Sequence, residues 1–212
     1  MSAFYRICIF GSLAVLLLMP ESAAAQGDWE IDANLFRFSF LVGEEEPGVN
    51  WSNLFDDGIG GALEAGFRKF YPGVFVLGVG FDKFAGKSVT NFSGASGNFS
   101  DLNLFTFYAG GRFYVSDAIR HRHRQSPVAF YVRTDAGASY IESVDFNSDF
   151  GSFALGPDVS DFMFDVGAGL DVKLADRTVL FLEAKYENFG APGGSGNRVQ
   201  AFPLGFGLRQ IF

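Results

Sequence analysis

Apolar residues occupy every second position in eight stretches of the chain, a spacing typical of β-strands whose two faces have different surroundings. In the clearest stretch, apolar residues at the even positions from 162 to 174 alternate with Asp, Met, Gly and Lys. The alternation changes phase between Leu35 and Phe36, which predicts a β-bulge there. We expect strands over about 29–42, 58–71, 74–84, 101–115, 127–141, 161–174, 180–187 and 198–212.

The connections between these strands alternate in length. Polar segments rich in Gly, Ser, Asn and Asp follow the first, third, fifth and seventh strands, over residues 43–57, 85–100, 142–160 and 188–197. Short turns follow the second and sixth strands, and residues 116–126 form a connection of intermediate length. This rhythm is typical of barrels that cross a membrane. We predict an all-β fold, an eight-stranded antiparallel up-and-down transmembrane β-barrel, with a soluble periplasmic β-sandwich as the alternative.

The polar faces of the predicted strands carry seven basic and seven acidic residues, when Glu30, Asp32 and Asp161 are set aside as strand-end residues. In a barrel of eight strands these faces line a narrow interior that side chains fill. Buried charges are tolerated when they are paired, and equal numbers of both signs allow such pairing. We therefore predict a structural ion-pair network in the lumen, formed by Arg37, Glu64, Arg68, Asp82, Arg112, Arg133, Asp135, Asp165, Asp171, Lys173, Glu183, Lys185, Glu187 and Arg209.

The composition agrees with a membrane barrel and excludes some other classes of protein. The 212 residues include 27 Phe and 27 Gly, which suits a sheet with an aromatic outer face and small residues where it bends. The net charge of -8 argues against nucleic acid as a partner. Aromatic residues near strand ends are expected to form an interfacial girdle, namely Trp29, Tyr71, Tyr114, Tyr140 and Tyr186.

The N-terminal segment has the features of an export signal. Arg6 precedes an apolar run over residues 7–19, and small residues at 23–25 provide a cleavage pattern. The run is too short for a membrane-spanning helix. We predict a cleaved signal peptide over residues 1–25 and an outer-membrane barrel domain over residues 26–212. The single cysteine, Cys8, lies in the predicted signal peptide, so the mature chain has no thiol for a disulfide, a metal site or a nucleophile.

Two segments carry a resemblance to a known family. Residues 166–186 read VGAGLDVKLADRTVLFLEAKY, a Gly-rich strand, a short Asp-containing turn and a strand with Glu and Lys on its polar face. Together with FPLGFGLRQIF at 202–212, this hairpin resembles the small eight-stranded outer-membrane β-barrels of the OmpA/OmpX-like superfamily. The resemblance implies the outer membrane of a Gram-negative bacterium, with membrane lipid and lipopolysaccharide as partners. It selects no single function, because the family includes anchors, adhesins, permeation proteins and a few lipid A-modifying enzymes.

The last residues of the chain also resemble the signal that the barrel-assembly machinery reads at the C-terminus of such proteins. The resemblance rests on alternating apolar positions at Phe206, Leu208 and Phe212. Gln210 departs from the pattern, because an aromatic or aliphatic residue is usual at its position. The resemblance makes the assembly machinery an expected partner during biogenesis.

Catalytic chemistry has little support in the sequence. Lipid A deacylases of similar size use a Ser and a His on the membrane-facing surface, and His is the usual general base. The two histidines, His121 and His123, lie in the RHRHR segment of a connection predicted on the periplasmic side. We expect that basic segment to lie near anionic lipid head groups. We predict no enzyme activity and assign no catalytic, cofactor-binding or metal-binding residue.

These observations favour a non-enzymatic outer-membrane barrel with a structural or surface-interaction role, a filled lumen and four long extracellular loops. The alternative is a barrel that passes ions or a small solute. A lipid A-modifying enzyme is less favoured because of the position of the histidines. Conductance distinguishes the first two hypotheses, and lipid A composition tests the third.

Overall fold

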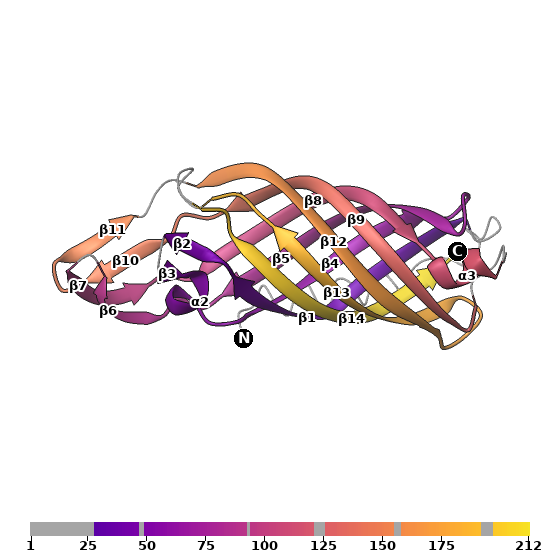
Figure 1. The fold of residues 1–212 in the computed structure, drawn as a ribbon, viewed down its shortest axis with the longest axis horizontal. Helices are drawn as coiled ribbons and strands as arrows, with labels where there is room; N and C mark the ends of the chain where they lie inside the picture. Colours follow the sequence, from indigo (N-terminus) through magenta and orange to yellow (C-terminus); the bar gives the residue numbers. More distant parts are fainter. Residues whose placement is uncertain (1–27, 47–48, 93, 121–125, 155–157, 192–196) are drawn as a thin grey trace.

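A computed structural model describes residues 28–46, 49–92, 94–120, 126–154, 158–191 and 197–212. Within these ranges eight antiparallel strands close into a barrel, which confirms the predicted fold class (Figure 1). Neighbouring strands in the chain pair with each other around the barrel, as expected for an up-and-down topology. The barrel strands are β1 (Trp29–Val42), β4 (Gly58–Phe67), β5 (Gly73–Phe84), β8 (Leu102–Phe113), β9 (Val128–Ile141), β12 (Val159–Lys173), β13 (Thr178–Asn188) and β14 (Gln200–Ile211).

The barrel closes where the first strand pairs with the last. β1 and β14 are antiparallel from Glu30 opposite Ile211 to Val42 opposite Gln200. The amide of Phe212 donates to the carbonyl of Trp29 at 2.8 Å, which extends the pairing to the end of the chain. The register shifts at Leu35, which is the position of the predicted bulge. Closure leaves the barrel without free strand edges.

The long connections contain more regular structure than we expected from their composition. The first connection holds β2 (Glu44–Glu46), β3 (Val49–Asn50) and the short helix α2 (Trp51–Leu54). The third and fifth connections hold β6 (Ser88–Phe92), β7 (Ala95–Phe99), β10 (Asp145–Ser148) and β11 (Gly151–Ala154). These four strands form one sheet in the order β11-β10-β7-β6, which protrudes beyond the barrel at what we call the loop end (Figure 1). Their Ser, Asn and Gly content had indicated irregular loops.

The opposite end, which we call the turn end, carries both the start of β1 and the end of β14. The predicted fourth strand was too long there. β8 ends at Phe113, and residues 115–119 form the helix α3 (Val115–Ile119). Tyr114, between the two elements, is fully buried inside the barrel rather than in the outer girdle.

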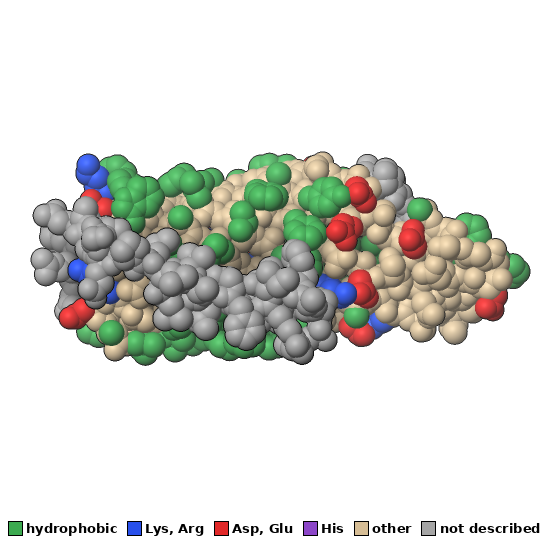
Figure 2. All heavy atoms as spheres, turned by 180° about the vertical axis from the view of Figure 1, so that it is seen from behind, with side chains coloured by type: hydrophobic (Ala, Val, Ile, Leu, Met, Phe, Trp, Pro, Cys, Tyr) green, Lys and Arg blue, Asp and Glu red, His purple; other side chains and the backbone are tan. Residues whose placement is uncertain are grey.

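The outer face of the barrel is apolar along its length. Phe75, Phe107, Phe130 and Phe162 are each at least half exposed, as are other apolar residues around the wall. Figure 2 shows hydrophobic side chains spread over the barrel, whereas acidic side chains gather where it meets the protruding sheet. No helix in the described ranges is long and apolar enough to cross a membrane. An exposed apolar wall of this extent needs an apolar environment around it.

The exposure of Phe107 provides a test of that environment. Phe107 lies near the middle of β8 and is 61% exposed. If the wall faces lipid, we expect Phe107→Arg to lower the free energy of unfolding by about 2–4 kcal/mol. Phe150→Arg, in the turn between β10 and β11, is the matched control and should change it by less than about 0.5 kcal/mol. Urea unfolding in lipid vesicles measures both, and equal effects would contradict a lipid-facing wall.

Candidate functional site

The lumen near the turn end is organised around Arg112 of β8. Its guanidinium donates to Glu30 at 2.6 Å, to Asp32 at 2.5 Å and to Glu64 at 3.1 Å. Glu30 and Asp32 come from β1 and Glu64 comes from β4, so one side chain links three strands of the barrel. Charge-assisted bonds of this kind are stronger than neutral ones.

A second arginine completes this layer from the opposite wall. Arg209 of β14 donates to Asp32 at 2.7 Å and to the Tyr114 hydroxyl at 2.6 Å, and it pairs with Asp171 of β12. The Tyr114 hydroxyl in turn donates to Asp171 at 2.7 Å. Strands β12 and β14 are thereby tied through the lumen to β1. Ion pairs across the barrel hold these side chains in fixed positions.

The middle of the lumen is filled around Arg133 of β9. Its guanidinium lies 3.0 Å from a carboxylate oxygen of Glu64 and 3.0 Å from one of Glu183, and it also pairs with Asp135. The Tyr108 hydroxyl donates to Glu64 at 2.7 Å, and the Tyr131 hydroxyl donates to Glu183 at 2.9 Å. The two carboxylates therefore each accept from both an arginine and a tyrosine.

Towards the loop end, four carboxylates surround Lys185 of β13. Its ammonium nitrogen lies 3.3 Å from Asp135, 3.4 Å from Asp165, 3.6 Å from Glu183 and 3.9 Å from Glu187. Arg37 of β1 lies on the loop-end side of Lys185. It pairs with Glu187 and lies 2.8 Å from Asp82, which also accepts from Ser39 at 2.7 Å.

Thirteen of the fourteen residues that we assigned to the lumen are buried there. The exception is Lys173, which lies at the exposed turn end and pairs with Asp176 at 3.0 Å. Two members were missed. Glu30 and Asp32 had been set aside as strand-end residues, yet they are 1% and 2% exposed. Their alternation with Trp29 and Ile31 was the signal that could have identified them.

The expected balance of charge does not hold. The described part of the lumen holds nine buried carboxylates and six buried cations. The excess gathers around Asp165, which lies directly opposite Asp135 on β9 and Glu187 on β13. Three carboxylates thus lie side by side on adjacent strands. Lys185 and the flanking arginines are the only cations placed to neutralise them among the described residues.

A layer of apolar side chains closes the lumen at the loop end. Trp51 and Leu54 of α2 pack there with Phe84, Phe99 and residues from several barrel strands, each nearly inaccessible to solvent. The ring centroids of Phe55 and Phe99 are 5.8 Å apart, and those of Phe99 and Phe146 are 5.0 Å apart. We call this layer the apolar lid, with the members Leu41, Trp51, Leu54, Phe55, Phe84, Phe99, Leu102, Leu104, Tyr108, Ile141, Val144, Phe146, Met163, Phe189, Val199 and Ala201. The apolar lid is therefore built from the connections as well as from the barrel strands.

Polar and aromatic groups close the turn end. Tyr71 packs against Tyr114 with ring centroids 5.2 Å apart, and its hydroxyl donates to Asp117 of α3. Asp117 also accepts from the amide of Ser126 at 3.0 Å. Burial raises the pKa of Tyr71, so its phenol remains a proton donor to Asp117. The predicted place of Tyr71 in an outer girdle is therefore wrong.

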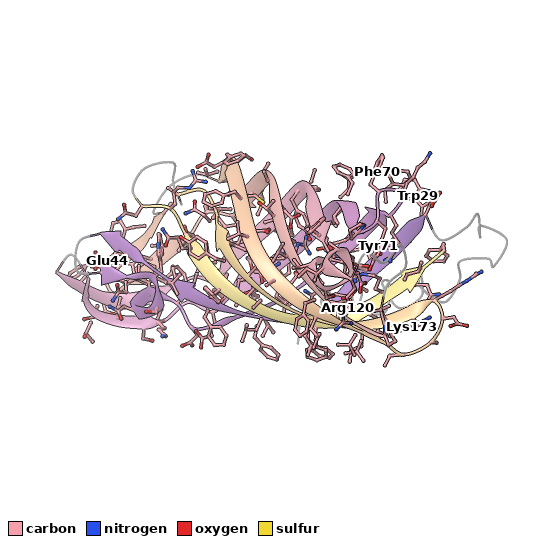
Figure 3. All side chains as sticks on the ribbon, turned by 45° about the vertical axis from the view of Figure 1, so that its right-hand side comes forward. Trp29, Glu44, Phe70, Tyr71, Arg120 and Lys173 are labelled. Carbon is pink, nitrogen blue, oxygen red and sulfur yellow. The ribbon has the colours of Figure 1, made fainter. Side chains whose placement is uncertain are left out.

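The two ends differ in charge. Figure 3 shows Glu44 at the loop end and Arg120 and Lys173 at the turn end. At the loop end a hydrogen bond from Lys83 lowers the pKa of Asp101. A hydrogen bond from the Tyr140 hydroxyl likewise lowers the pKa of Asp158. Both carboxyls therefore remain ionised at neutral pH and keep the loop end acidic.

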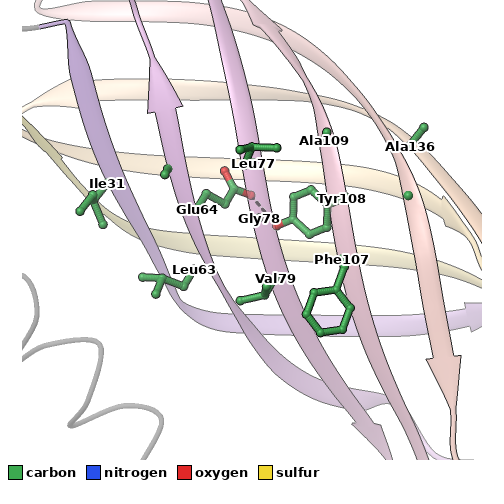
Figure 4. A pocket seen from close by; sticks show the side chains of 12 residues that line it. Ile31, Leu63, Glu64, Leu77, Gly78, Val79, Phe107, Tyr108, Ala109 and Ala136 are labelled. Atoms are coloured by element: carbon green, nitrogen blue, oxygen red, sulfur yellow. Dashed lines mark hydrogen bonds between the residues drawn. The ribbon is translucent and has the colours of Figure 1, made fainter.

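The outer wall is hollowed where small residues replace large ones. The hollow has a volume of about 580 Å³ and lies over Gly78, Ala109 and Ala136, between larger residues such as Leu63 and Phe107 (Figure 4). The hydrogen bond between Glu64 and Tyr108 lies at its floor. Since the lining is almost entirely apolar, we assign the hollow no chemistry beyond contact with apolar groups.

No described residues form a group of three His, Cys, Asp or Glu side chains suited to a metal ion. His121 and His123, the residues weighed for catalysis, lie outside the described ranges. The same is true of residues 1–25, the predicted signal peptide. The described lumen is a network of ion pairs, with the apolar lid at the loop end and Tyr71, Tyr114 and Asp117 at the turn end.

Comparison with protein-family models and with curated protein sequences finds no match. Solved structures do match. Neisserial surface protein A is 14% identical, with a TM-score of 0.52 over 87% of this chain and 96% of that one. OprG from Pseudomonas aeruginosa is 12% identical, with a TM-score of 0.52 over 88% and 96%.

The attachment invasion locus protein Ail of Yersinia pestis was solved with the heparin analogue sucrose octasulfate. It is 19% identical, with a TM-score of 0.50 over 85% of this chain and 97% of that one. At such low identities the three similarities bear on the fold and leave the activity open. Together with the closed barrel of eight strands, they show that this chain has the fold of the small eight-stranded outer-membrane β-barrels.

Proposed function

We propose that this protein is a non-enzymatic barrel of the Gram-negative outer membrane that acts through the surface of its protruding sheet. The observation that carries the proposal is the closed lumen. Ion pairs fill the barrel. The apolar lid covers the loop end, and polar and aromatic side chains cover the turn end. A filled barrel serves as a rigid anchor. It holds the sheet of β6, β7, β10 and β11 outside the membrane.

The fold and the apolar wall support the membrane location. A closed barrel satisfies its backbone hydrogen bonds internally, which is the requirement for strands in lipid. We infer that residues 1–25 direct export and are removed, and that residues 26–212 form the barrel domain. The loop end then faces the exterior, where the long connections of such barrels lie.

The expected partners follow from this placement. Membrane lipid contacts the wall, and lipopolysaccharide surrounds the loop end. Phe206 points outward from β14 and is 37% exposed, while Leu208 and Phe212 on the same face are partly exposed. These side chains lie on the outward face of β14, which supports their proposed role as the signal for the barrel-assembly machinery.

The charge of the loop end bears on the class of ligand. Ail was solved with a sulfated, strongly anionic compound. Here the segment from 142 to 161 carries five acidic residues and no Lys or Arg. Like charges repel, so an anionic ligand fits this surface poorly. We therefore infer no role in binding sulfated polysaccharides.

A second candidate function is the slow passage of small cations. The observation that favours it is the excess of carboxylates over cations in the described lumen. Carboxylate-lined paths prefer cations over anions. We rank it second because the apolar lid must open before any ion passes, and its members are almost completely buried.

Conductance provides the direct test of the closed lumen. We expect the refolded mature chain, incorporated in a planar bilayer, to show no discrete openings at neutral pH and moderate voltage. An outer-membrane porin measured in the same bilayer controls for insertion. Reproducible cation-selective openings would replace the anchor proposal with the second candidate.

Removal of one central arginine tests whether the ion pairs hold the barrel together. Arg112→Leu leaves Glu30, Asp32 and Glu64 without their shared cation. We expect the free energy of unfolding to fall by about 3–5 kcal/mol. Lys173→Leu, outside the network, should cost less than about 0.5 kcal/mol. Denaturant titration of refolded protein measures both changes, and similar values would contradict a structural role for the network.

Cell fractionation with intact-mass measurement tests the location and the export signal. We expect the full-length gene product to appear in the outer-membrane fraction with Gln26 as its first residue. Replacing the small residues at 23 and 25 with Arg should leave the uncleaved form. A soluble periplasmic product would contradict the membrane location, whatever its N-terminus.

A further inference from the structure

The protruding sheet has two edges, and the first connection lies beside the start of one of them. Beside β6, the amide of Lys87 donates to the carbonyl of Leu54 at 2.8 Å, and Asp56 donates to Ala85 at 2.8 Å. Residues of the first connection therefore bond to the chain just before β6 and lie beside the start of that edge. β11 is the other edge strand, and no described strand pairs with its outer side. All four of its residues are exposed.

An exposed edge strand offers backbone hydrogen bonds to a partner. Alternate residues of β11 bond to β10, so the amide and carbonyl groups of the remaining residues point outward. Natural edges are often protected by a lysine, a proline or a covering segment. β11 reads Gly-Ser-Phe-Ala and has neither Lys nor Pro.

A row of phenylalanines leads across the sheet to this edge. Phe99 of β7, Phe146 of β10 and Phe153 of β11 lie directly opposite one another, so they share one face of the sheet. Phe99 and Phe146 are each 4% exposed within the apolar lid, whereas Phe153 is 53% exposed. The row of phenylalanines therefore extends past the apolar lid, and its last member, Phe153, is exposed to solvent. An apolar residue on a further strand would extend the row and shield Phe153.

The charge around the edge favours one kind of strand. Asp145 lies opposite Ala154, Asp149 lies in the turn between β10 and β11, and Glu142 and Asp158 lie close by in the chain. No described Lys or Arg forms an ion pair with Asp145 or Asp149. A strand that carries positive charges meets this surface favourably.

We propose that the outer edge of β11 is a docking site for an extended, basic polypeptide segment of another protein, which adds a fifth strand to the protruding sheet. The proposal rests on the surface-interaction role proposed above and names its partner class. Backbone bonds to β11 supply part of the affinity, and side chains at alternate positions supply specificity. One face of the added strand covers Phe153, and its positive charges lie near Asp145 and Asp149.

The test uses the full mature chain refolded in nanodiscs of zwitterionic lipid. The probe is a short fluorescent peptide in which Lys alternates with Val and Phe. We expect saturable binding by fluorescence anisotropy, with empty nanodiscs as the background. A peptide of the same composition with its Lys residues in one block should bind more weakly by roughly tenfold, because it cannot present alternating faces. An alternating peptide with Glu in place of Lys should also bind weakly.

Two matched variants locate the site. Phe153→Lys places a charge on the edge strand and should weaken binding by roughly tenfold. Phe150→Lys makes the same chemical change in the adjoining turn, where Phe150 is 79% exposed. It should weaken binding by less than about threefold, because it adds the same charge away from the edge. Isotope-edited infrared spectra of a carbonyl-labelled peptide should show an intermolecular β-sheet band only with the wild type and Phe150→Lys.

Several outcomes would overturn the proposal. These are no binding above empty nanodiscs, equal loss in the two variants, or binding without the β-sheet band. Self-association of the wild type through β11 without peptide binding would assign the edge to a second copy instead. A heat-induced shift in gel mobility verifies that each variant is folded. Conductance and fractionation test the anchor role separately, so failure of the peptide to bind leaves that proposal standing.

Discussion

The pairing of β1 with β14 is the constraint on which the rest of the structure depends. The ladder runs from Glu30 opposite Ile211 to Val42 opposite Gln200, with one bulge at Leu35, and it leaves no open edge in the barrel. Closure separates the chain into an outer wall and an enclosed lumen, and the two-residue period of each strand assigns side chains to one or the other. The apolar wall and the charged interior are therefore two consequences of a single geometric condition.

Because the lumen is enclosed, each charge in it loses its hydration, and the free-energy cost is offset only when a charge of opposite sign lies beside it. Arg112, Arg133 and Arg209 each contact carboxylates from more than one strand, so the network ties distant parts of the sequence together. Small residues give these side chains room. A Cβ at Gly78 would lie 2.4 Å from the Tyr108 ring, so glycine there lets the tyrosine cross the lumen to Glu64.

Because the lumen is filled, the proposed surface role falls to the segments beyond the barrel. The apolar lid is shared between barrel strands and connections, because Phe99 and Phe146 of the protruding sheet pack with Trp51, Phe55 and the upper barrel residues. The sheet is thus fixed to the barrel by its own core, and it projects from a rigid base. Its two edges differ, since the first connection bonds to the chain just before β6, whereas no described strand pairs with the outer side of β11. This asymmetry is what distinguishes the loop end from a set of independent loops.

The sequence alone determined the eight strands, the bulge at Leu35 and most of the lumen residues, because strand alternation is a local property that closure preserves. It could not determine which charges meet. Glu30 and Asp32 looked like strand ends, Lys173 looked internal, and Tyr114 looked like a girdle residue. The stagger of the barrel decides how far each strand end extends into the lumen, and stagger is a tertiary quantity. The protruding sheet was missed for the same reason, since its short, polar strands are stabilised by pairing and by the apolar lid rather than by their own composition.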